Sequence, residues 1–441
     1  MILYSETFDQ DTLAKMCQHD PVVVFYRAFF GLIDWSPFTS CSSEPSKRGR
    51  PAHPEIAYIK ALLVKIVEGK KHITDLRTFL LRHPLLVLEL GFIPHGDPKE
   101  TYGFDIQKTV PSDSWLRNKQ RNLDHPLLQN IFSGTVRALQ KEIPGLGETV
   151  AFDVTHIYAW VKENNFRQYV KDRFCKERQP AGDPDCKVGV KRSTNQEQPD
   201  GTIKVKKEYL WGYGSGIVSA ITAEYGDVVL AECTQTFREG DVTYYRSLHQ
   251  QTVDTLKFFP TNITADAAFD AWYIYHACAL QGGIAAIPLN QHAHPTFERD
   301  TDGVPFCPKK MRMIPTKQFN HTNGYRAQRY QCPLLFPQAT GQACDHEQFV
   351  KGKGCVKDIN IEKGGIMRVT LDRHHPVYKA IYDQRTSAER INSQAKALGL
   401  ERPHVRRMSS VCNINTLTYI IINVRALQRS RSINRRILQM N

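Results

Sequence analysis

Residues 148–160 read ETVAFDVTHIYAW, and this stretch decides the fold. Its larger apolar side chains recur at every second position, a period that predicts a β-strand. These apolar positions are Val150, Phe152, Val154, Tyr158 and Trp160. Asp153 falls on the opposite face of the strand. The sequence therefore predicts a strand that carries one carboxylate on its polar side.

A second stretch, residues 258–280, reads FFPTNITADAAFDAWYIYHACAL and places another carboxylate in a similar position. Ile263 and Ala265 alternate with polar residues, and the pattern then turns helical. The helical spacing is carried by Trp272, His276 and Ala279. Asp266 therefore falls at the C-terminal end of a strand, where open α/β sheets bind ligands. Asp270 is its rival, but it lies in the first helical turn, where Asp commonly accepts from backbone amides.

The third stretch follows the spacing Y-x2-R-x3-E-x6-K near the C-terminus. Its members are Tyr382, Arg385, Glu389 and Lys396. At about 100° per residue, they project within roughly a 60° arc if the segment is one helix. The opposite face carries small and apolar side chains, at Ala388, Ile391, Ala395 and Leu398. One face with an aromatic ring, two cations and a carboxylate suits an anionic substrate. The alternative is a surface ion pair between Arg385 and Glu389.

Three carboxylates from two strands and one helix, Asp153, Asp266 and Glu389, can hold two hard divalent cations. Mg²⁺ prefers oxygen ligands and keeps several waters. A pair of such ions can activate a water or a 3′-hydroxyl and stabilise the leaving oxygen of a phosphodiester. His156, three residues beyond Asp153, is expected to be structural rather than a metal ligand.

With these motifs the chain resembles bacterial DDE-type insertion-sequence transposases that carry the Y-x2-R-x3-E-x6-K signature. The resemblance extends from about residue 45 to 430. It implies a ribonuclease-H-like catalytic core, a mixed α/β sheet flanked by helices. An N-terminal helical domain and an insertion before the last catalytic helix would accompany it. The catalytic, metal-binding triad would be Asp153, Asp266 and Glu389, and the DNA-binding residues Tyr382, Arg385 and Lys396.

The same resemblance implies metal-dependent DNA cleavage at element ends, followed by strand transfer into target DNA. Two Mg²⁺ ions, with Mn²⁺ as a substitute, would be the cofactors. The partners would be double-stranded DNA, as terminal inverted repeats and target, and a second copy of the chain in a DNA-bound synaptic homodimer. Two alternatives stay open: an inactive transposase-derived DNA-binding protein, and a nuclease of the same fold without strand transfer.

The pattern divides the chain into four segments. Residues 1–125 are predicted to be helical. Two of these helices would flank a basic turn at Gly69, Lys70 and Lys71, as a helix-turn-helix or as a plain helical hairpin. The second of the two would be capped by Thr74 or Asp75. Residues 145–294 alternate strands and helices and form the first part of the core; 172–207 are predicted to be a mobile loop. Residues 295–370 are the insertion, and residues 371–441 hold the Glu389 helix and a basic C-terminal helix or tail.

The insertion mixes aromatic residues with cations, which suits contact with nucleic acid, although a solvated β-subdomain is the alternative. These residues are Phe319, Tyr325, Tyr330, Lys309, Lys310, Arg312, Lys317, Arg326 and Arg329. Four cysteines also fall here, at Cys307, Cys332, Cys344 and Cys355. They could form a structural zinc site, but they lack a CxxC pair, so unpaired structural cysteines are favoured.

Composition limits the function classes. The chain has 441 residues, 41% of them hydrophobic, and a net charge of +13, so it predicts folded domains that attract polyanions. From residue 401 onward eight Arg face a single acid, Glu401, a pattern typical of phosphate binding. No secretory signal and no long apolar run are visible, which argues against a membrane partner. Eleven scattered Cys favour reduced thiols, so we expect a bacterial cytoplasmic, nucleoid-associated protein.

Overall fold

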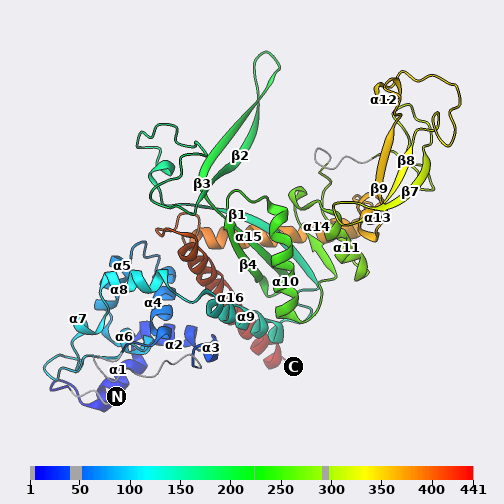
Figure 1. Ribbon diagram of the computed structural model, residues 1–441. Coiled ribbons are helices and arrows are strands. Elements are labelled where there is room, and N and C mark those ends of the chain that lie inside the picture. The colour runs from blue at the N-terminus through cyan, green and yellow to red at the C-terminus, as the bar shows by residue number, and fades with distance from the viewer. Residues whose placement is uncertain (1–4, 40–51, 223, 291–296, 441) are drawn as a thin grey trace. The chain divides into compact units, whose positions relative to one another are not determined.

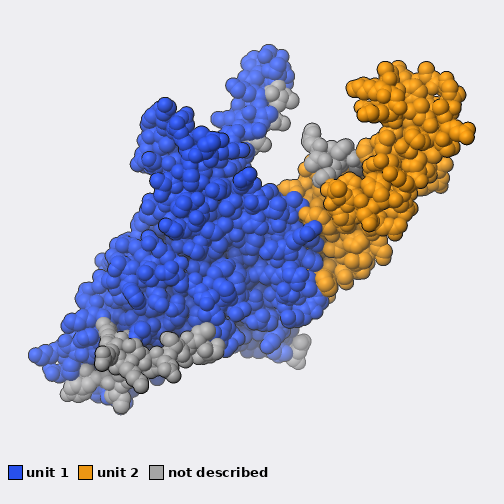
Figure 2. Space-filling view, viewed as in Figure 1, with its two compact units in different colours: residues 1–147, 152–258, 386–441 blue, residues 148–151, 259–385 orange. Residues whose placement is uncertain are grey.

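The computed structural model describes residues 5–39, 52–222, 224–290 and 297–440. It has a mixed α/β fold (Figure 1). The chain divides into two compact units (Figure 2). Unit 1 comprises residues 1–147, 152–258 and 386–441, and unit 2 comprises 148–151 and 259–385.

The N-terminal part of unit 1 is helical, as the sequence predicts. Asp20 begins one of these helices by accepting hydrogen bonds from the backbone N–H of Val22 and Val23, which satisfies two free amides of the first turn. The helices are α1 (Gln10–His19), α2 (Pro21–Phe30), α3 (Ser36–Thr39), α4 (Glu55–Val67), α5 (Ile73–Leu81), α6 (Pro84–Leu90), α7 (Ile106–Thr109), α8 (Asp113–Arg121) and α9 (His125–Glu142).

Helices α4 and α5 flank the predicted basic turn, in which Gly69 adopts a positive φ of 59°. Residues 57–59 and 61–66 of α4 are all buried, so α4 is a core helix rather than an amphipathic surface helix. The second helix begins two or three residues earlier than predicted. His72 is its N-cap residue, and Asp75 accepts from the His72 backbone N–H at 3.0 Å. The predicted caps at Thr74 and Asp75 are therefore wrong.

The central sheet is mixed and has the strand order β2-β3-β1-β5-β6, with β4 paired to β3. Its strands are β1 (Thr149–Tyr158), β2 (Lys187–Glu197), β3 (Ile203–Thr222), β4 (Gly226–Thr236), β5 (Asn262–Thr264) and β6 (Ala285–Ala286). The first half of β3 pairs antiparallel with β2 and its second half with β4. The prediction of a mobile loop at 172–207 is wrong for the part that forms β2 and the start of β3.

Two long helices complete the core of unit 1. Helix α16 (Met408–Met440) packs against α9 and β4, and α10 (Tyr245–Leu256) also packs on β4 (Figure 1). Asn423 of α16 is fully buried, where it accepts from the Val229 N–H and donates to the Val229 carbonyl. The basic C-terminal segment is therefore a core helix whose arginines lie on its solvent side: Arg425, Arg429, Arg435 and Arg436 are exposed and Arg431 is half-buried.

Unit 2 combines a short parallel sheet with the insertion. The first residues of β1 pair in parallel with β5, which pairs in parallel with β6. A separate antiparallel sheet, β7-β8-β9, forms most of the insertion. The remaining elements are α11 (Trp272–Leu280), β7 (Ile314–Asn320), β8 (Arg326–Gln331), α12 (Glu347–Val350), β9 (Val356–Asn360), α13 (Lys363–Thr370) and α14 (Pro376–Tyr382). The insertion thus contains the β-structure of the alternative interpretation, a small β-subdomain.

Candidate active site

The parallel pairing of β1 with β5 relates the two predicted aspartates. Ala151 pairs with Thr264, and Asp153 and Asp266 each follow a member of that pair by two residues. Asp266 lies just past the end of β5, as predicted. It begins a short 3₁₀ turn, Ala267–Phe269, and accepts from the Ala268 N–H at 2.9 Å. Asp153 and Asp266 therefore occupy matching positions, each two residues beyond the last paired residue of its strand.

Asp153 is held by the helix that carries Glu389. This helix is α15 (Thr386–Ala397), in unit 1 like Asp153. The side-chain Nδ2 of Asn392 donates to Asp153 Oδ2 at 2.8 Å. Asn392 is 6% exposed, and its Oδ1 atom is buried without a hydrogen-bond partner. Asn392 lies three residues after Glu389, so the two side chains project from neighbouring positions of one helix face.

Sequence reasoning missed Asn392. The available signal was its spacing of three from Glu389, which places it about 60° from Glu389 and roughly 20° beyond the edge of the polar stripe. Its amide can donate to one carboxylate and also offer an oxygen to a cation. Asn392 is therefore a candidate site residue beside Asp153 and Glu389.

Helix α15 has its rotation fixed by contacts on both sides of Glu389. Arg390 donates from Nε and Nη2 to the two Asp227 oxygens of β4, each at 2.7 Å. The Ser387 and Ser219 hydroxyls are buried and lie 2.8 Å apart. The predicted apolar face is confirmed by burial of Ala388, Ile391 and Ala395. These contacts leave Glu389 exposed on the other side of the helix.

The expectation that one helix carries all four signature residues is wrong. Helix α14 ends at Tyr382, a 3₁₀ turn spans Asp383–Arg385, and α15 begins at Thr386. Tyr382 and Arg385 belong to unit 2, whereas the other two belong to unit 1. The physical reason is that α14 packs against β5 and β6, while α15 packs against β3 and β4. A single straight helix would bury only one continuous face.

In unit 2, Tyr382 and Arg385 form one small cluster close to the end of β5. The Tyr382 ring stacks on Tyr378 at 6.0 Å and 10°, and the Arg385 guanidinium lies 5.9 Å from the Tyr382 ring centre. The Thr264 hydroxyl donates to the Tyr382 carbonyl at 3.4 Å. Because Thr264 precedes Asp266 by two residues, the signature tyrosine is tied to the strand that leads to that carboxylate.

In unit 1, Lys396 is exposed and helps set the charge of His156. Burial, together with the positive charges of Lys191 and Lys396, lowers the pKa of His156 to about 4, against the opposing effect of Glu401. The His156 ring contacts Phe237 edge-on, with ring centres 4.5 Å apart. The imidazole is thus neutral near pH 7, and its packing fits the expected structural role.

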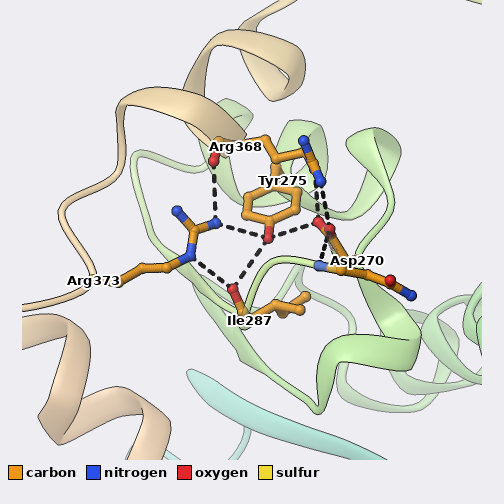
Figure 3. Close-up of polar contacts among 6 residues, drawn as sticks. Asp270, Tyr275, Ile287, Arg368 and Arg373 are labelled. Atoms are coloured by element: carbon orange, nitrogen blue, oxygen red, sulfur yellow. Dashed lines mark hydrogen bonds and ion pairs between the residues drawn. The ribbon is translucent and has the colours of Figure 1, made fainter. Parts of the chain in front are cut away.

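Asp270 is engaged in a buried network and is not available to a metal (Figure 3). Its side chain is fully buried, and Arg368 donates to both of its oxygens, at 2.8 and 2.6 Å. The Tyr275 hydroxyl lies 3.1 Å from Oδ1, and the Asn290 N–H donates to Oδ2 at 2.7 Å. Arg373 braces the network through Tyr275 and the Arg368 carbonyl. Asp270 therefore ties the segment that precedes α11 to α13, and the choice of Asp266 as the metal ligand stays a prediction.

The four cysteines of the insertion come together. Cys307, Cys332 and Cys355 are buried in one apolar cluster, and Cys344 packs against it. Burial, and then the neighbouring cysteines, raise the pKa of the Cys355 thiol, so it stays protonated. Across residues 5–39, 52–222, 224–290 and 297–440, no three His, Cys, Asp or Glu side chains form a group that could hold a metal ion. The triad and the zinc site therefore stay predictions.

Several cations of the insertion are paired with carboxylates. Arg329 forms a two-pronged bond with Asp358 at 2.8 Å, and Arg312 bonds to Asp302 at 2.7 Å. Lys309 pairs with Asp345. These pairs fit the solvated β-subdomain better than a nucleic-acid surface. His292 and His294, which we leave out of the triad, lie outside the described residues.

Comparisons with known proteins add little. No family model matches the sequence, and no curated protein matches it. Among solved structures, the cryo-EM structure of a piggyBac transposase synaptic complex with hairpin DNA aligns over 95% of this chain and 80% of its own. The identity is 12% and the TM-score 0.33, values that establish neither fold nor function. Within the described residues, no helix is both long and apolar enough to cross a membrane.

Proposed function

We propose that this chain is a DDE-type transposase, which cleaves DNA at element ends in a metal-dependent reaction and transfers the freed strand into target DNA. The observation that carries the proposal is the Asn392–Asp153 hydrogen bond of 2.8 Å. It links the central strand β1 to the helix that bears Glu389. The mixed sheet, with an Asp-bearing first strand beside the strand that leads to Asp266, supports a ribonuclease-H-like core.

Asp153 and Asn392 offer oxygen atoms of the kind that a hard divalent cation prefers. The fit rests on the buried, unpartnered Oδ1 of Asn392, an oxygen beside the Asp153 carboxylate that a cation would satisfy. Asp153, Asp266 and Glu389 would hold the ions, because Mg²⁺ prefers oxygen ligands of this kind. When bound, two Mg²⁺ ions supply activation of the attacking hydroxyl and stabilisation of the leaving oxygen.

The chain's own residues would position the DNA. Arg385 suits two-pronged contact with a backbone phosphate, and Lys396 suits a point-charge contact. Tyr382, stacked on Tyr378, would pack on or hydrogen-bond the terminal strand. The rigid docking of α15 through Arg390 fixes where Lys396 and Glu389 project. Activity in a DNA-bound homodimer is part of the same proposal.

The test uses single-turnover cleavage of a duplex that carries the element's end, with Mg²⁺ present. Asp153→Ala, Asp266→Ala and Glu389→Ala should each abolish cleavage and leave duplex affinity largely intact. Asp254→Ala is the matched control, because this carboxylate lies in α10 and accepts a hydrogen bond from the neighbouring Gln250 side chain. Full cleavage by any of the three would remove that residue from the triad.

Strand transfer separates a transposase from a nuclease of the same fold. Lys396→Ala and Arg385→Ala should impair end-specific cleavage and joining far more than nonspecific nicking supported by Mn²⁺. Each lost phosphate contact should cost on the order of 1–3 kcal/mol. Cleavage without any joined product would favour the nuclease alternative.

A further inference from the structure

Two adjoining hollows in unit 1 lie away from the carboxylates. The inner hollow, of about 230 Å³, lies where α4, α5 and α8 meet the segment that leads into α16. The outer hollow, of about 540 Å³, is lined by the segment after β1 and by residues 402–406. Trp160, His404 and Arg406 line both hollows, so the two form one continuous channel.

Among the described residues, positively charged side chains and no carboxylates line the inner hollow. Five cations are among these residues: Lys65, Lys71, Arg117, Arg121 and Arg406. Lys65 is 7% exposed, and burial lowers its pKa to about 8, against the attraction of Asp75. A buried ammonium group without a counter-charge destabilises the folded protein, so an anion bound in the inner hollow would stabilise it.

The same hollow contains polar atoms with unused hydrogen-bonding capacity. Gln120 Nε2, His404 Nδ1 and Ser410 Oγ are each buried and have no hydrogen-bond partner. Gln120 is 6% exposed and Ser410 is 2% exposed, so neither side chain is satisfied at the protein surface. Buried polar groups are normally paired, and unpaired ones indicate a missing partner. Donors from an amide and a hydroxyl, beside several cations, match a phosphate oxygen.

The outer hollow adds aromatic surface to the charge. Trp160 is 44% exposed; its ring stacks on His404 at 5.3 Å and 27°, and the Arg406 guanidinium lies 4.8 Å from its centre. The Arg402 guanidinium lies 4.1 Å from the Tyr158 ring. No Asp or Glu is among the described residues that line this hollow. Aromatic rings interleaved with cations are typical of channels for single-stranded nucleic acid.

We propose that this channel binds a single-stranded segment of nucleic acid, with one backbone phosphate seated in the inner hollow and a neighbouring base against the exposed ring of Trp160. A single strand fits better than a duplex, because only unstacked bases can present their faces to aromatic rings. The proposal extends the proposed function, since it names a second nucleic-acid site on the same chain. It does not depend on catalysis or on Mg²⁺.

The test is fluorescence anisotropy with a labelled dT12 strand and a duplex of equal length, in EDTA and across a series of salt concentrations. The double variant Arg117→Glu/Arg121→Glu should weaken dT12 binding by at least roughly tenfold and reduce the salt slope by about 0.7, the value for one lost phosphate contact on a single strand. Arg137→Glu/Arg238→Glu, a pair that lines neither hollow, is the matched control. It makes the same charge change at exposed positions of the same unit and should change affinity by less than about twofold.

Aromatic substitutions test stacking separately from charge. Trp160→Ala should weaken dT12 binding roughly tenfold, whereas Trp160→Phe should restore most of it. Thermal unfolding of each variant shows whether the fold is retained. The variant Gln120→Leu tests the inner hollow without changing its charge. Equal losses from both arginine pairs, or a larger loss for duplex than for dT12, would overturn the proposal. The same assay in an Asp153→Ala background should give unchanged affinity, so failure of the triad and failure of this site are distinguishable.

Discussion

The buried pair of Asp270 and Arg368 gives a quantitative test of the structure. In Arg368→Met, Asp270 keeps its charge in a fully buried position but loses both guanidinium bonds. Removing one partner of a buried pair typically costs about 3–5 kcal/mol. Asp270 would still accept from the Asn290 N–H and the Tyr275 hydroxyl, so we expect the lower end, about 3 kcal/mol.

The assay can be confined to unit 2. Trp272 is the one tryptophan of residues 259–385, and it opens α11 two residues after Asp270. Urea unfolding followed by ¹⁹F NMR of 5-fluorotryptophan-labelled protein therefore reports the stability around the pair through the Trp272 resonance.

Two further variants make the reasoning refutable. Arg329→Met removes a partner from a pair with Asp358 that is about one-quarter to one-third exposed, so its loss should cost about 1 kcal/mol or less. The double variant Asp270→Asn/Arg368→Met should recover most of the stability that Arg368→Met loses, because no buried charge remains. If Arg368→Met costs no more than Arg329→Met, Asp270 is not held as a buried carboxylate and its exclusion from the metal site fails.

Two other predictions concern the core of unit 1. Burial raises the pKa of Glu232 from 4.5 to about 7. Between these pH values the folded state keeps a proton on Glu232 that the unfolded state has released. The free energy of unfolding should therefore fall by about 3 kcal/mol as pH rises from about 4.5 to 7. Glu232→Gln should remove that slope in urea unfolding measured from pH 4 to 8, and a slope unchanged in the variant would contradict the assignment. Deletion of residues 428–441 should lower the unfolding midpoint as well as weaken DNA binding, because Arg431 and Asn434 both bond to Glu142; an unchanged midpoint would show that this segment is a free tail.

Short-range periodicity predicted three local features of the candidate site. Strand β1 was predicted from its alternation, and α15 from the spacing of its small apolar residues, which are buried. The position of Asp266 after β5 was predicted from alternation as well. Only in α15 does the period reflect one buried and one polar face, because β1 has buried residues on both faces, such as Ala151 and Phe152.

The β2–β3 hairpin could not be predicted in this way. Residues 204–209 of β3 are all exposed, so neither face of this part of the strand is apolar enough to show a period of two. Its lysines and the nearby Pro and Gly are typical of loops. Backbone pairing with β2, from Glu197↔Ile203 to Lys187↔Gly212, forms these strands instead. Such pairing depends on a partner strand rather than on the local pattern.

The basic C-terminal segment was predicted from charge, and its core position was not. The arginines of α16 occur among buried residues such as Asn415, Tyr419 and Asn423. Polar residues in the interior of a helix lower its apparent amphipathicity, although here each one bonds to the sheet or to α9. A count of apolar positions does not detect polar side chains that bond within the core. The sequence of α16 therefore resembled that of a solvated tail.

The signature spacing shows where helical geometry stops being predictive. Positions on one helix share a face only while the helix is continuous, and the 3₁₀ turn at Asp383–Arg385 breaks that relation. Within α15 the relation holds, and it places Asn392 beside Glu389. The hydrogen bond that relates this helix to a second carboxylate joins Asn392 to Asp153, which lie 239 positions apart in the chain. No local pattern encodes such a distance, so the sequence supplied the candidate acids, and the hydrogen bond supplied the reason to treat two of them as one site.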